Sequence, residues 1–219
     1  MAKRILWTLL ALQLLPSCSS EPSSQQTPPV KFDHIIVGVS NLEAGIQDLE
    51  QLTGVRAELG GVHPGEGTRN ALISLGEGAY LELYAPNPEE TIVSPIVTEL
   101  QNLQRLKPMY WAVSTTDVNA LRAHFDTRGL PLSLPEAGSR VRPDGSVVKW
   151  VMFYFGKFDH SLAPFFIRWE QPELHPSRTS PGGCKLVSIR LQDPAPMELK
   201  AAIQPLGLGV PVDQGTEKQ

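Results

Sequence analysis

The stretch FDHIIVGVSNLEAGIQDLEQLTG, residues 32–54, decides the fold of this chain. Its first eight residues are rich in β-branched side chains, which favours a β-strand over residues 32–39. Ser40 and Asn41 then provide a helix N-cap, and apolar residues follow at the spacings of three and four that mark one helix face. Gly54 ends this helix, as glycine commonly does. The stretch therefore predicts a strand followed directly by a helix.

The same strand–helix pattern returns twice further along the chain. Residues 110–129 repeat it at an offset of 76 residues. Residues 186–207 repeat it after a similar interval, with a strand over 186–191 and Gly207 after the helix. Three such patterns at near-constant spacing indicate an internal repeat.

More strands follow each of the first two helices. In the first unit they are predicted over residues 55–62, 68–75 and 79–85, and in the second over 132–134, 147–155 and 164–169. Segment 79–86 aligns with 165–172 at an offset of 86, so the second unit carries an insertion, which we place around 135–160. Each full unit is therefore βαβββ, and the third is about half a unit that ends in a short strand over 209–212. The predicted fold class is α+β.

Two motifs within these units resemble a known family. GGVHPGEGTRNAL (60–72) and PFFIRWE (164–170) resemble the glyoxalase-like branch of the vicinal oxygen chelate superfamily, which includes glyoxalase I and extradiol dioxygenases. The resemblance covers about residues 32–212. It implies that tandem βαβββ modules form a curved mixed sheet around a shared cavity. We accordingly expect modules over residues 32–95 and 96–178, and a partial third βαβ unit with a tail over 179–219.

The N-terminus resembles a bacterial lipoprotein signal. Lys3 and Arg4 precede an apolar run over residues 5–15 that is too short to cross a bilayer as a helix. The following Leu-Pro-Ser-Cys, which ends at Cys18, resembles a lipobox. The resemblance implies a signal peptide over 1–17, lipidation of Cys18, a flexible tether over 18–31, and a domain held on a membrane of the cell envelope, facing the periplasm or the exterior. The alternative is an ordinary secretory peptide with an incidental cysteine.

Composition excludes some partners. The chain has 19 Lys and Arg against 23 Asp and Glu, a net charge of −4, which disfavours a nucleic-acid-binding protein. The chain has two cysteines, and lipidation of Cys18 would leave only Cys184 in the folded part, so no disulfide is expected there. We expect a small-molecule ligand as the partner, and the incomplete third unit leaves pairing with a second copy of the chain open.

The resemblance also implies candidate metal ligands. In metal-using members of the superfamily each module supplies one ligand from its first strand and one from its last, and His34 and Glu82 match these positions in the first module. The expected metals are Fe, Zn, Mn, Ni or Co, and the same two residues are the catalytic candidates. The repeat offsets place Tyr110 and Arg168 at the matching positions of the second module, and neither residue is a usual ligand.

Other uses of these residues remain open. His63 could supply a third ligand from its loop, whereas Arg168 could pair with Glu82 or bind a carboxylate or phosphate of a ligand. The glycine-containing loop between the second and third strands could present His63, Arg69 and Asn70 to a ligand, or it could be a structural turn. In the plainest interpretation His34 and Glu82 are polar residues satisfied by one another and by Arg168.

Three functions are therefore compatible with the sequence. The first is a lyase, isomerase or dioxygenase-type enzyme that acts on a small oxygenated or anionic molecule in the inter-module cavity. The second is a metal-free protein that binds or sequesters such a ligand. The third is a non-catalytic interaction module tethered to a surface.

Overall fold

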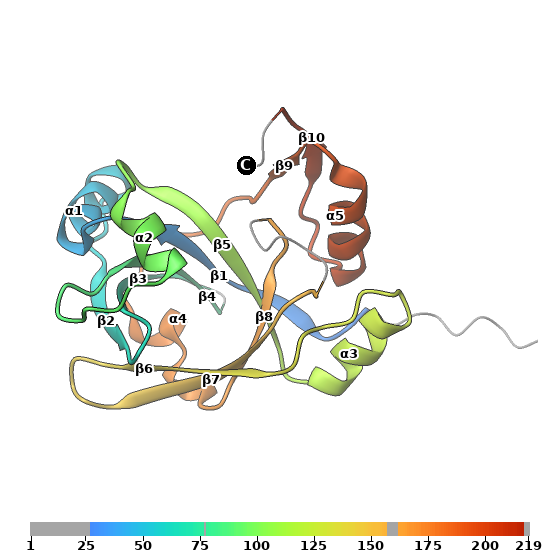
Figure 1. The fold of residues 1–219 in the computed structure, drawn as a ribbon, viewed down its shortest axis with the longest axis horizontal. Coiled ribbons are helices and arrows are strands. Elements are labelled where there is room, and N and C mark those ends of the chain that lie inside the picture. Colours follow the sequence, from blue (N-terminus) through green and yellow to red (C-terminus); the bar gives the residue numbers. More distant parts are fainter. Residues whose placement is uncertain (1–26, 77, 157–161, 217–219) are drawn as a thin grey trace, which may run out of the picture.

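The computed structural model describes residues 27–76, 78–156 and 162–216, and the predicted signal peptide with Cys18 lies outside them. Eight strands form a closed barrel in the order β1-β4-β3-β2-β6-β7-β8-β5 (Figure 1). The curved mixed sheet with few helices confirms the predicted α+β fold class. No helix among the described residues is both long enough and apolar enough to span a membrane.

The first module has the predicted βαβββ order. Its elements are β1 (Val30–Gly38), α1 (Leu42–Thr53), β2 (Glu58–His63), β3 (Thr68–Gly76) and β4 (Ala79–Pro86). The side chain of Asn41 caps α1 by accepting a hydrogen bond from the amide of Ala44 (2.9 Å). Gly54 ends α1 with a φ of 74°, the left-handed conformation that glycine adopts without strain.

The second module repeats this order after an additional helix. Its elements are α2 (Pro95–Gln101), β5 (Lys107–Thr115), α3 (Val118–Asp126), β6 (Glu136–Val141), β7 (Val147–Phe153) and β8 (Phe165–Trp169). In each module the first and last strands pair in parallel, β1 with β4 and β5 with β8. The two halves of the barrel therefore have the same topology, as the repeat predicted.

One predicted strand was wrong. Residues 132–134 do not form the second strand of this module, because Leu132 makes only an isolated bridge with Phe155. The strand is β6, in a segment that we had assigned to the insertion. The extra length lies mainly between β7 and β8, which are joined by residues 154–164, whereas residues 77–78 suffice between β3 and β4.

The two modules meet along two unequal seams. On one side β1 and β5 are antiparallel and pair from Val30 opposite Thr115 to Gly38 opposite Lys107. On the other side β2 and β6 pair only where Val62 faces Val141. The barrel is therefore firmly joined at one seam and closed by a single pair of residues at the other.

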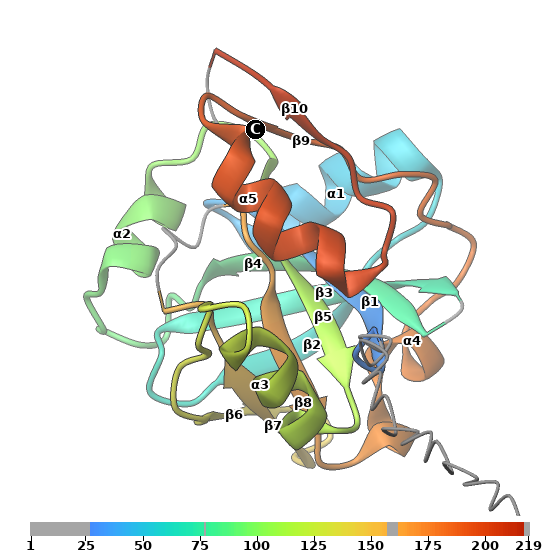
Figure 2. The ribbon, with the colours of Figure 1, turned by 90° about the vertical axis from the view of Figure 1, so that its right-hand side faces the viewer.

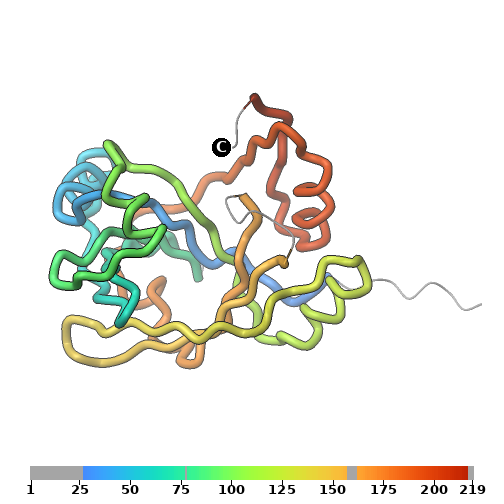
Figure 3. The backbone as a smooth tube through the Cα atoms, in the orientation of Figure 1, coloured from blue at the N-terminus to red at the C-terminus, as the bar shows by residue number. Residues whose placement is uncertain are grey.

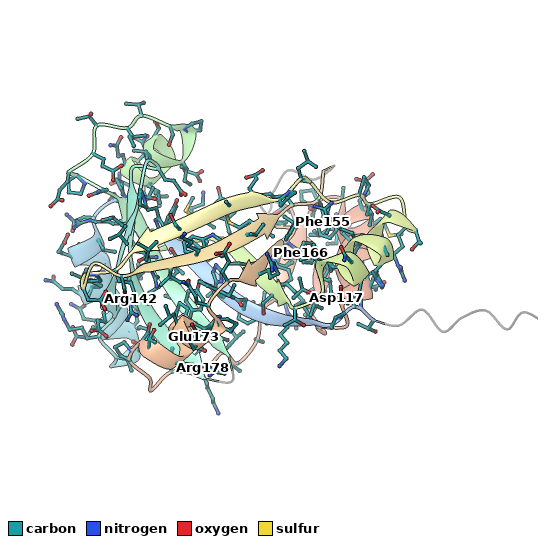
Figure 4. All side chains as sticks on the ribbon, turned by 90° about the horizontal axis from the view of Figure 1, so that it is seen from below. Asp117, Arg142, Phe155, Phe166, Glu173 and Arg178 are labelled. Carbon is teal, nitrogen blue, oxygen red and sulfur yellow. The ribbon has the colours of Figure 1, made fainter. Side chains whose placement is uncertain are left out.

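Two hydrophobic cores lie outside the barrel, between its strands and the helices. In the first module, Ile46 and Leu49 of α1 pack against β3 and β4. In the second, Phe125 of α3 and Phe155 and Phe166 form an edge-to-face cluster (Figure 4). Because side chains alternate along a strand, the opposite faces of these strands point into the barrel.

The third unit packs against the second module, with α5 beside the barrel (Figures 2 and 3). A connecting segment with η1 (Pro172–Leu174) and α4 (Pro176–Thr179) precedes it, and the unit itself comprises β9 (Leu191–Asp193), α5 (Pro196–Ile203), η2 (Gln204–Leu206) and β10 (Val212–Gln214). The strand predicted over 186–191 is wrong in extent, since β9 begins only at Leu191. β10 begins where the short strand predicted over 209–212 ends. The two strands pair in parallel as a separate two-stranded sheet.

Candidate functional site

The barrel encloses a cavity of about 90 Å³ between its two halves. Apart from Ile36, the first module contributes a polar wall that consists of His34, His63, Glu66, Asn70, Tyr80, Glu82 and Tyr84. The second module contributes a mainly apolar wall that includes Trp150, Met152, Phe165, Ile167 and Trp169. The cavity is therefore chemically two-sided, with titratable groups opposite aromatic rings.

Glu82 of β4 is the centre of the polar wall. Its side chain is buried, and Oε1 accepts a hydrogen bond from Nδ2 of Asn70 at 2.7 Å. Oε2 lies 3.9 Å from Nε2 of His34, and Oε1 lies 3.8 Å from Nε2 of His63. Each carboxylate oxygen thus faces a different imidazole.

A β-bulge orients His34. Phe32 pairs with Val113 and His34 with Ala112, so Asp33 has no partner on β5, and both Asp33 and His34 are buried. The short hydrogen bond of 2.6 Å joins Nδ1 of His34 to Oδ1 of Asp33. Because an ionised carboxylate only accepts hydrogen bonds, Nδ1 of His34 is the donor in this contact, and Nε2 faces Glu82 in the cavity.

Two further groups hold Asp33. Its Oδ2 accepts hydrogen bonds from Nε1 of Trp169 (3.1 Å) and from Nε2 of His175 (3.2 Å). His175 in turn accepts on Nδ1 from the backbone amide of Ser177 (3.2 Å). Burial by itself raises the pKa of Asp33, but the hydrogen bonds from His175 and His34 outweigh it and hold the pKa well below its usual value of 3.8.

His63 of β2 is oriented in a similar way. Thr68 donates from Oγ1 to the hydroxyl of Tyr84 (3.1 Å), so His63 donates from Nδ1 to Thr68 Oγ1 (3.0 Å). Nε2 of His63 is then an acceptor that faces Asn70 Nδ2 at 3.4 Å and Glu82. Burial lowers the pKa of His63 below 6.5, an effect that the charge of Glu82 partly offsets.

The sequence missed one functional candidate, Arg140 of β6. Its side chain is almost fully buried and lines the cavity beside Trp150. Burial lowers the pKa of Arg140, and the neighbouring Tyr80 and Glu82 partly offset this effect. A lone arginine in a segment with a single β-branched residue gives no sequence signal, because the face on which it lies is defined only once β6 is known.

Two residues predicted for the second module lie elsewhere. Arg168 is exposed on the outer face of β8, in a groove with Asp117 and Arg122, and it makes no ion pair with Glu82. Tyr110 pairs with Ile36 and is half-buried outside the residues that line the cavity. The prediction that Arg168 faces Glu82 across the barrel is therefore corrected.

The strand pairings identify the true counterparts. His34 pairs with Tyr80, and Ala112 pairs with Phe165, so Ala112 matches His34. The inward-facing residues Tyr80, Glu82 and Tyr84 then match Phe165, Ile167 and Trp169, and all six line the cavity. Ile167 thus stands where the second module would need the counterpart of Glu82.

The residues predicted for the loop between β2 and β3 lie on these two strands and fall into two environments. His63 and Asn70 line the cavity, as expected for residues that meet a ligand. Arg69 points the other way and forms an ion pair with Glu43 of α1 (2.9 Å between Nη2 and Oε2). The prediction that Arg69 faces the cavity ligand is therefore corrected.

The arrangement does not fit the metal centre that the fold family implies. Within residues 27–76, 78–156 and 162–216, no three His, Cys, Asp or Glu side chains converge to hold a metal ion. Oε1 of Glu82 already accepts from Asn70, and the second module offers only Ala112 and Ile167 at the matching positions. The guanidinium of Arg140 lines the same cavity and opposes a second cation.

Comparisons with known proteins agree with this fold. A model of a glyoxalase-like domain matches residues 32–207. A hypothetical protein from Staphylococcus aureus is 18% identical with a TM-score of 0.66, and the match covers 87% of this chain and 88% of that one. Methylmalonyl-CoA epimerase from Mycobacterium tuberculosis is 19% identical with a TM-score of 0.44, over 66% of this chain and 90% of that one. No curated protein matches. Because the domain model spans most of the sequence, the chain belongs to the glyoxalase-like domain family.

Proposed function

We propose that the barrel cavity binds a small oxygenated or anionic molecule and that Glu82 exchanges a proton with it, as in a lyase or isomerase reaction. One observation carries the proposal: a buried carboxylate lies between the Nε2 atoms of His34 and His63, with one oxygen toward each. The carboxylate is held by Asn70 and faces two imidazoles, so it is placed to take up a proton from a ligand in the cavity.

The step itself is simple. The carboxylate of Glu82 takes a proton from a carbon next to a carbonyl group of the ligand, so that a C–H bond breaks and an O–H bond forms. The electron pair of the C–H bond moves onto the carbonyl oxygen, which becomes an enolate. Return of the proton to the opposite face of that carbon inverts its configuration and completes an isomerisation, whereas return to the same face restores the starting molecule. His34 and His63 flank the carboxylate, and each is held in one tautomer by Asp33 or Thr68.

The opposite wall supports this chemistry. Trp150, Phe165 and Trp169 surround the polar centre with aromatic surface and displace water from it. Electrostatic interactions are stronger in such a site than in water. A ligand would therefore find its reactive carbon among fixed polar groups and its apolar part against the aromatic rings.

Solvent deuterium exchange tests the proposal. Pyruvate, lactate and dihydroxyacetone are incubated with the protein in D₂O, and proton NMR follows their carbon-bound protons. At least one of these compounds should exchange carbon-bound protons for deuterium. Glu82→Gln is expected to lower that rate by about 100-fold or more, the range of general base catalysis. Glu89→Gln, at an exposed position, is the matched control and should leave it unchanged.

The same assay addresses the metal. Exchange is expected to persist after dialysis against EDTA, because the described residues do not converge on a metal site. Loss of exchange on chelation, with recovery on adding one divalent ion, would contradict the metal-free version. Equal rates for Glu82→Gln and the unmodified protein would remove Glu82 from the reaction.

A second candidate function is metal-free binding or sequestration of the ligand. It is favoured by the apolar side chains of Ala112 and Ile167, which can neither bind a metal nor transfer a proton. The second module therefore leaves the reaction centre incomplete. Saturable binding without exchange of any carbon-bound proton is the outcome expected for this function.

We further propose that the domain is anchored in the cell envelope by a lipid on Cys18. The support is the sequence alone: a basic and then apolar leader, a lipobox-like Leu-Pro-Ser-Cys, and a polar tether. A tethered barrel would meet small molecules of the periplasm or the exterior.

A further inference from the structure

The cavity contains a cation that the proposed proton transfer does not use. Arg140 is 3% exposed, and its Nε has no hydrogen-bond partner. Throughout the described part of the chain, no ion pair or side-chain hydrogen bond involves its guanidinium. A buried charge without a partner is strongly destabilising, so another group is expected to meet it.

The position of Arg140 narrows what that group is. On β6 its neighbours across the ladder to β7 are apolar, since Arg140 pairs with Val148 and Gly138 with Trp150. The side chain lines the central cavity and also a polar pocket of about 170 Å³ beside β2, near Arg142 and Ser180. Arg140 therefore borders space on two sides, and neither acidic residue of the central cavity, Glu66 or Glu82, forms an ion pair with it in the described part of the chain.

Glu82 does not neutralise Arg140. The two residues line the same cavity, and the negative charge of Glu82 raises the pKa of Arg140, but no ion pair joins them. The closest groups to the Glu82 carboxylate are Asn70, His34 and His63. An anionic group placed against Arg140 would thus lie in the same cavity as the proton acceptor without displacing any existing contact.

We propose that Arg140 anchors the carboxylate of a small monocarboxylic acid. The guanidinium presents a planar fork that matches a carboxylate bidentately. The carbon beside the carboxylate would then lie toward Glu82, and the apolar end would lie against Met152 and Phe165. The orientation toward Glu82 rests on the proposed function, whereas the anchor itself does not.

The size of the cavity limits the acid. A cavity of about 150 Å³ admits benzene, and this one has about 90 Å³. The smaller volume favours small acids over larger ones, and pyruvate, lactate and propionate are the probes. Inorganic phosphate has the same charge and a similar size, so the experiment includes it as a separate probe.

Binding to four forms of the protein tests the anchor. Calorimetric titration and tryptophan fluorescence, with Trp150 and Trp169 as reporters in the cavity wall, give the affinity for each probe. Arg140→Met is expected to weaken carboxylate binding by about 10- to 100-fold, and Arg140→Lys by less, because lysine keeps the charge without the fork. Arg168→Met, on the outer face of β8, is the matched control and should bind like the unmodified protein.

Thermal unfolding shows that the variants are folded. Arg140→Met should melt at or above the temperature of the unmodified protein without ligand, because it replaces an unpaired buried charge by an apolar chain. The acids should raise the melting temperature of the unmodified protein and not that of Arg140→Met.

Three results would overturn the inference. They are equal carboxylate affinity in the unmodified protein and Arg140→Met, tighter binding of phosphate than of every acid, and no binding of any acid up to about 10 mM, the weak end of specific recognition. Failure of the proposed function is distinguishable: Arg140-dependent binding with no proton exchange leaves the anchor intact. Exchange that survives Arg140→Met with unchanged affinity leaves Glu82 in place and removes the anchor.

Discussion

Asp33 connects three distant parts of the sequence at one carboxylate. Its two oxygens accept hydrogen bonds from His34 on β1, Trp169 on β8 and His175 in the connecting segment. Asp33 does not line the cavity, so it acts on a ligand only through the cavity residues that it contacts, His34 and Trp169. It is a positioning residue that fixes which nitrogen of His34 faces Glu82.

Replacing Asp33 should alter both stability and the pH profile. Asp33→Asn is expected to cost about 2–4 kcal/mol of unfolding free energy, because buried donors lose a charged acceptor. The proton of His34 would no longer be held on Nδ1, so the pH dependence of the proton exchange should shift. Urea unfolding and exchange rates between pH 5 and 8 measure the two effects.

The loss of stability at low pH gives an independent check on the role of Asp33. The pKa of Asp33 is lower in the folded chain than its usual 3.8, so its contribution to stability is present above that value and is lost as the pH falls below it. Asp33→Asn should flatten this loss, and the exposed Asp48→Asn should not. A pH profile of exchange identical to that of the unmodified protein would show that Asp33 is structural only.

The sequence predicted the first half of the site and not the second. His34 and Glu82 follow from the family resemblance together with strand alternation, and both line the cavity. Arg168 failed because the offset of 86 exceeds the structural equivalence of Glu82 with Ile167 by one residue. A slip of one residue moves a side chain to the other face of a strand.

At the scale of elements, β6 carries the main difference between expectation and structure. Its sequence EAGSRV has one β-branched residue, so local propensity does not identify it as a strand. The strand exists because β7 pairs with it along its whole length, from Val141 opposite Val147 to Glu136 opposite Met152. Long-range pairing of this kind is invisible to local pattern, and Arg140 was missed with it.

The seam between β2 and β6 depends on one glycine. Gly61 has a φ of 139°, and a Cβ atom built there would lie 2.0 Å from the carbonyl oxygen of Val141. Gly61→Ala should therefore destabilise the fold by about 2 kcal/mol or more, through backbone strain and loss of the only pairing across this seam. Urea unfolding measures the cost.

A second glycine, Gly65, distinguishes the cost of backbone strain from the cost of a steric clash with β6. Gly65 also has a positive φ, 78°, but a Cβ atom there would meet nothing within 4 Å. Gly65→Ala should cost only about 1–2 kcal/mol, the strain of the left-handed conformation. If both variants lost the same stability, the close approach of Gly61 to β6 would have no energetic role.

At the scale of the whole molecule, both the duplication and the partial third βαβ unit were predictable, but the extent of the first strand of the third unit was not. Strand–helix patterns at constant spacing identified both modules, because each pattern is local. The third unit repeats the helix, with Leu199 and Ile203 buried, but residues 186–190 do not form the expected strand. No strand of the barrel is open to receive it, since the eight strands already close on one another.

The cellular location of the protein, on a membrane through a lipid on Cys18, is also a prediction about the whole molecule. In a bacterial host the chain should fractionate with membranes and carry added acyl mass on Cys18. Cys18→Ala should appear in the soluble fraction or as uncleaved precursor, whereas Cys184→Ala, which changes the other cysteine, should stay with the membranes. Mass spectrometry of the N-terminal peptide decides the matter, and an unacylated cysteine there would contradict lipidation.

The unequal pairing at the two seams has a consequence for the rates at which a ligand enters and leaves the cavity. Opposite the long ladder of β1 with β5, one pair of residues, Val62 and Val141, holds the wall shut. Separating that pair sacrifices very few backbone contacts, so brief parting there is far cheaper than global unfolding. The residence time of a ligand in the cavity should accordingly depend on how often this pair of residues separates, and not on the free energy of unfolding of the whole chain.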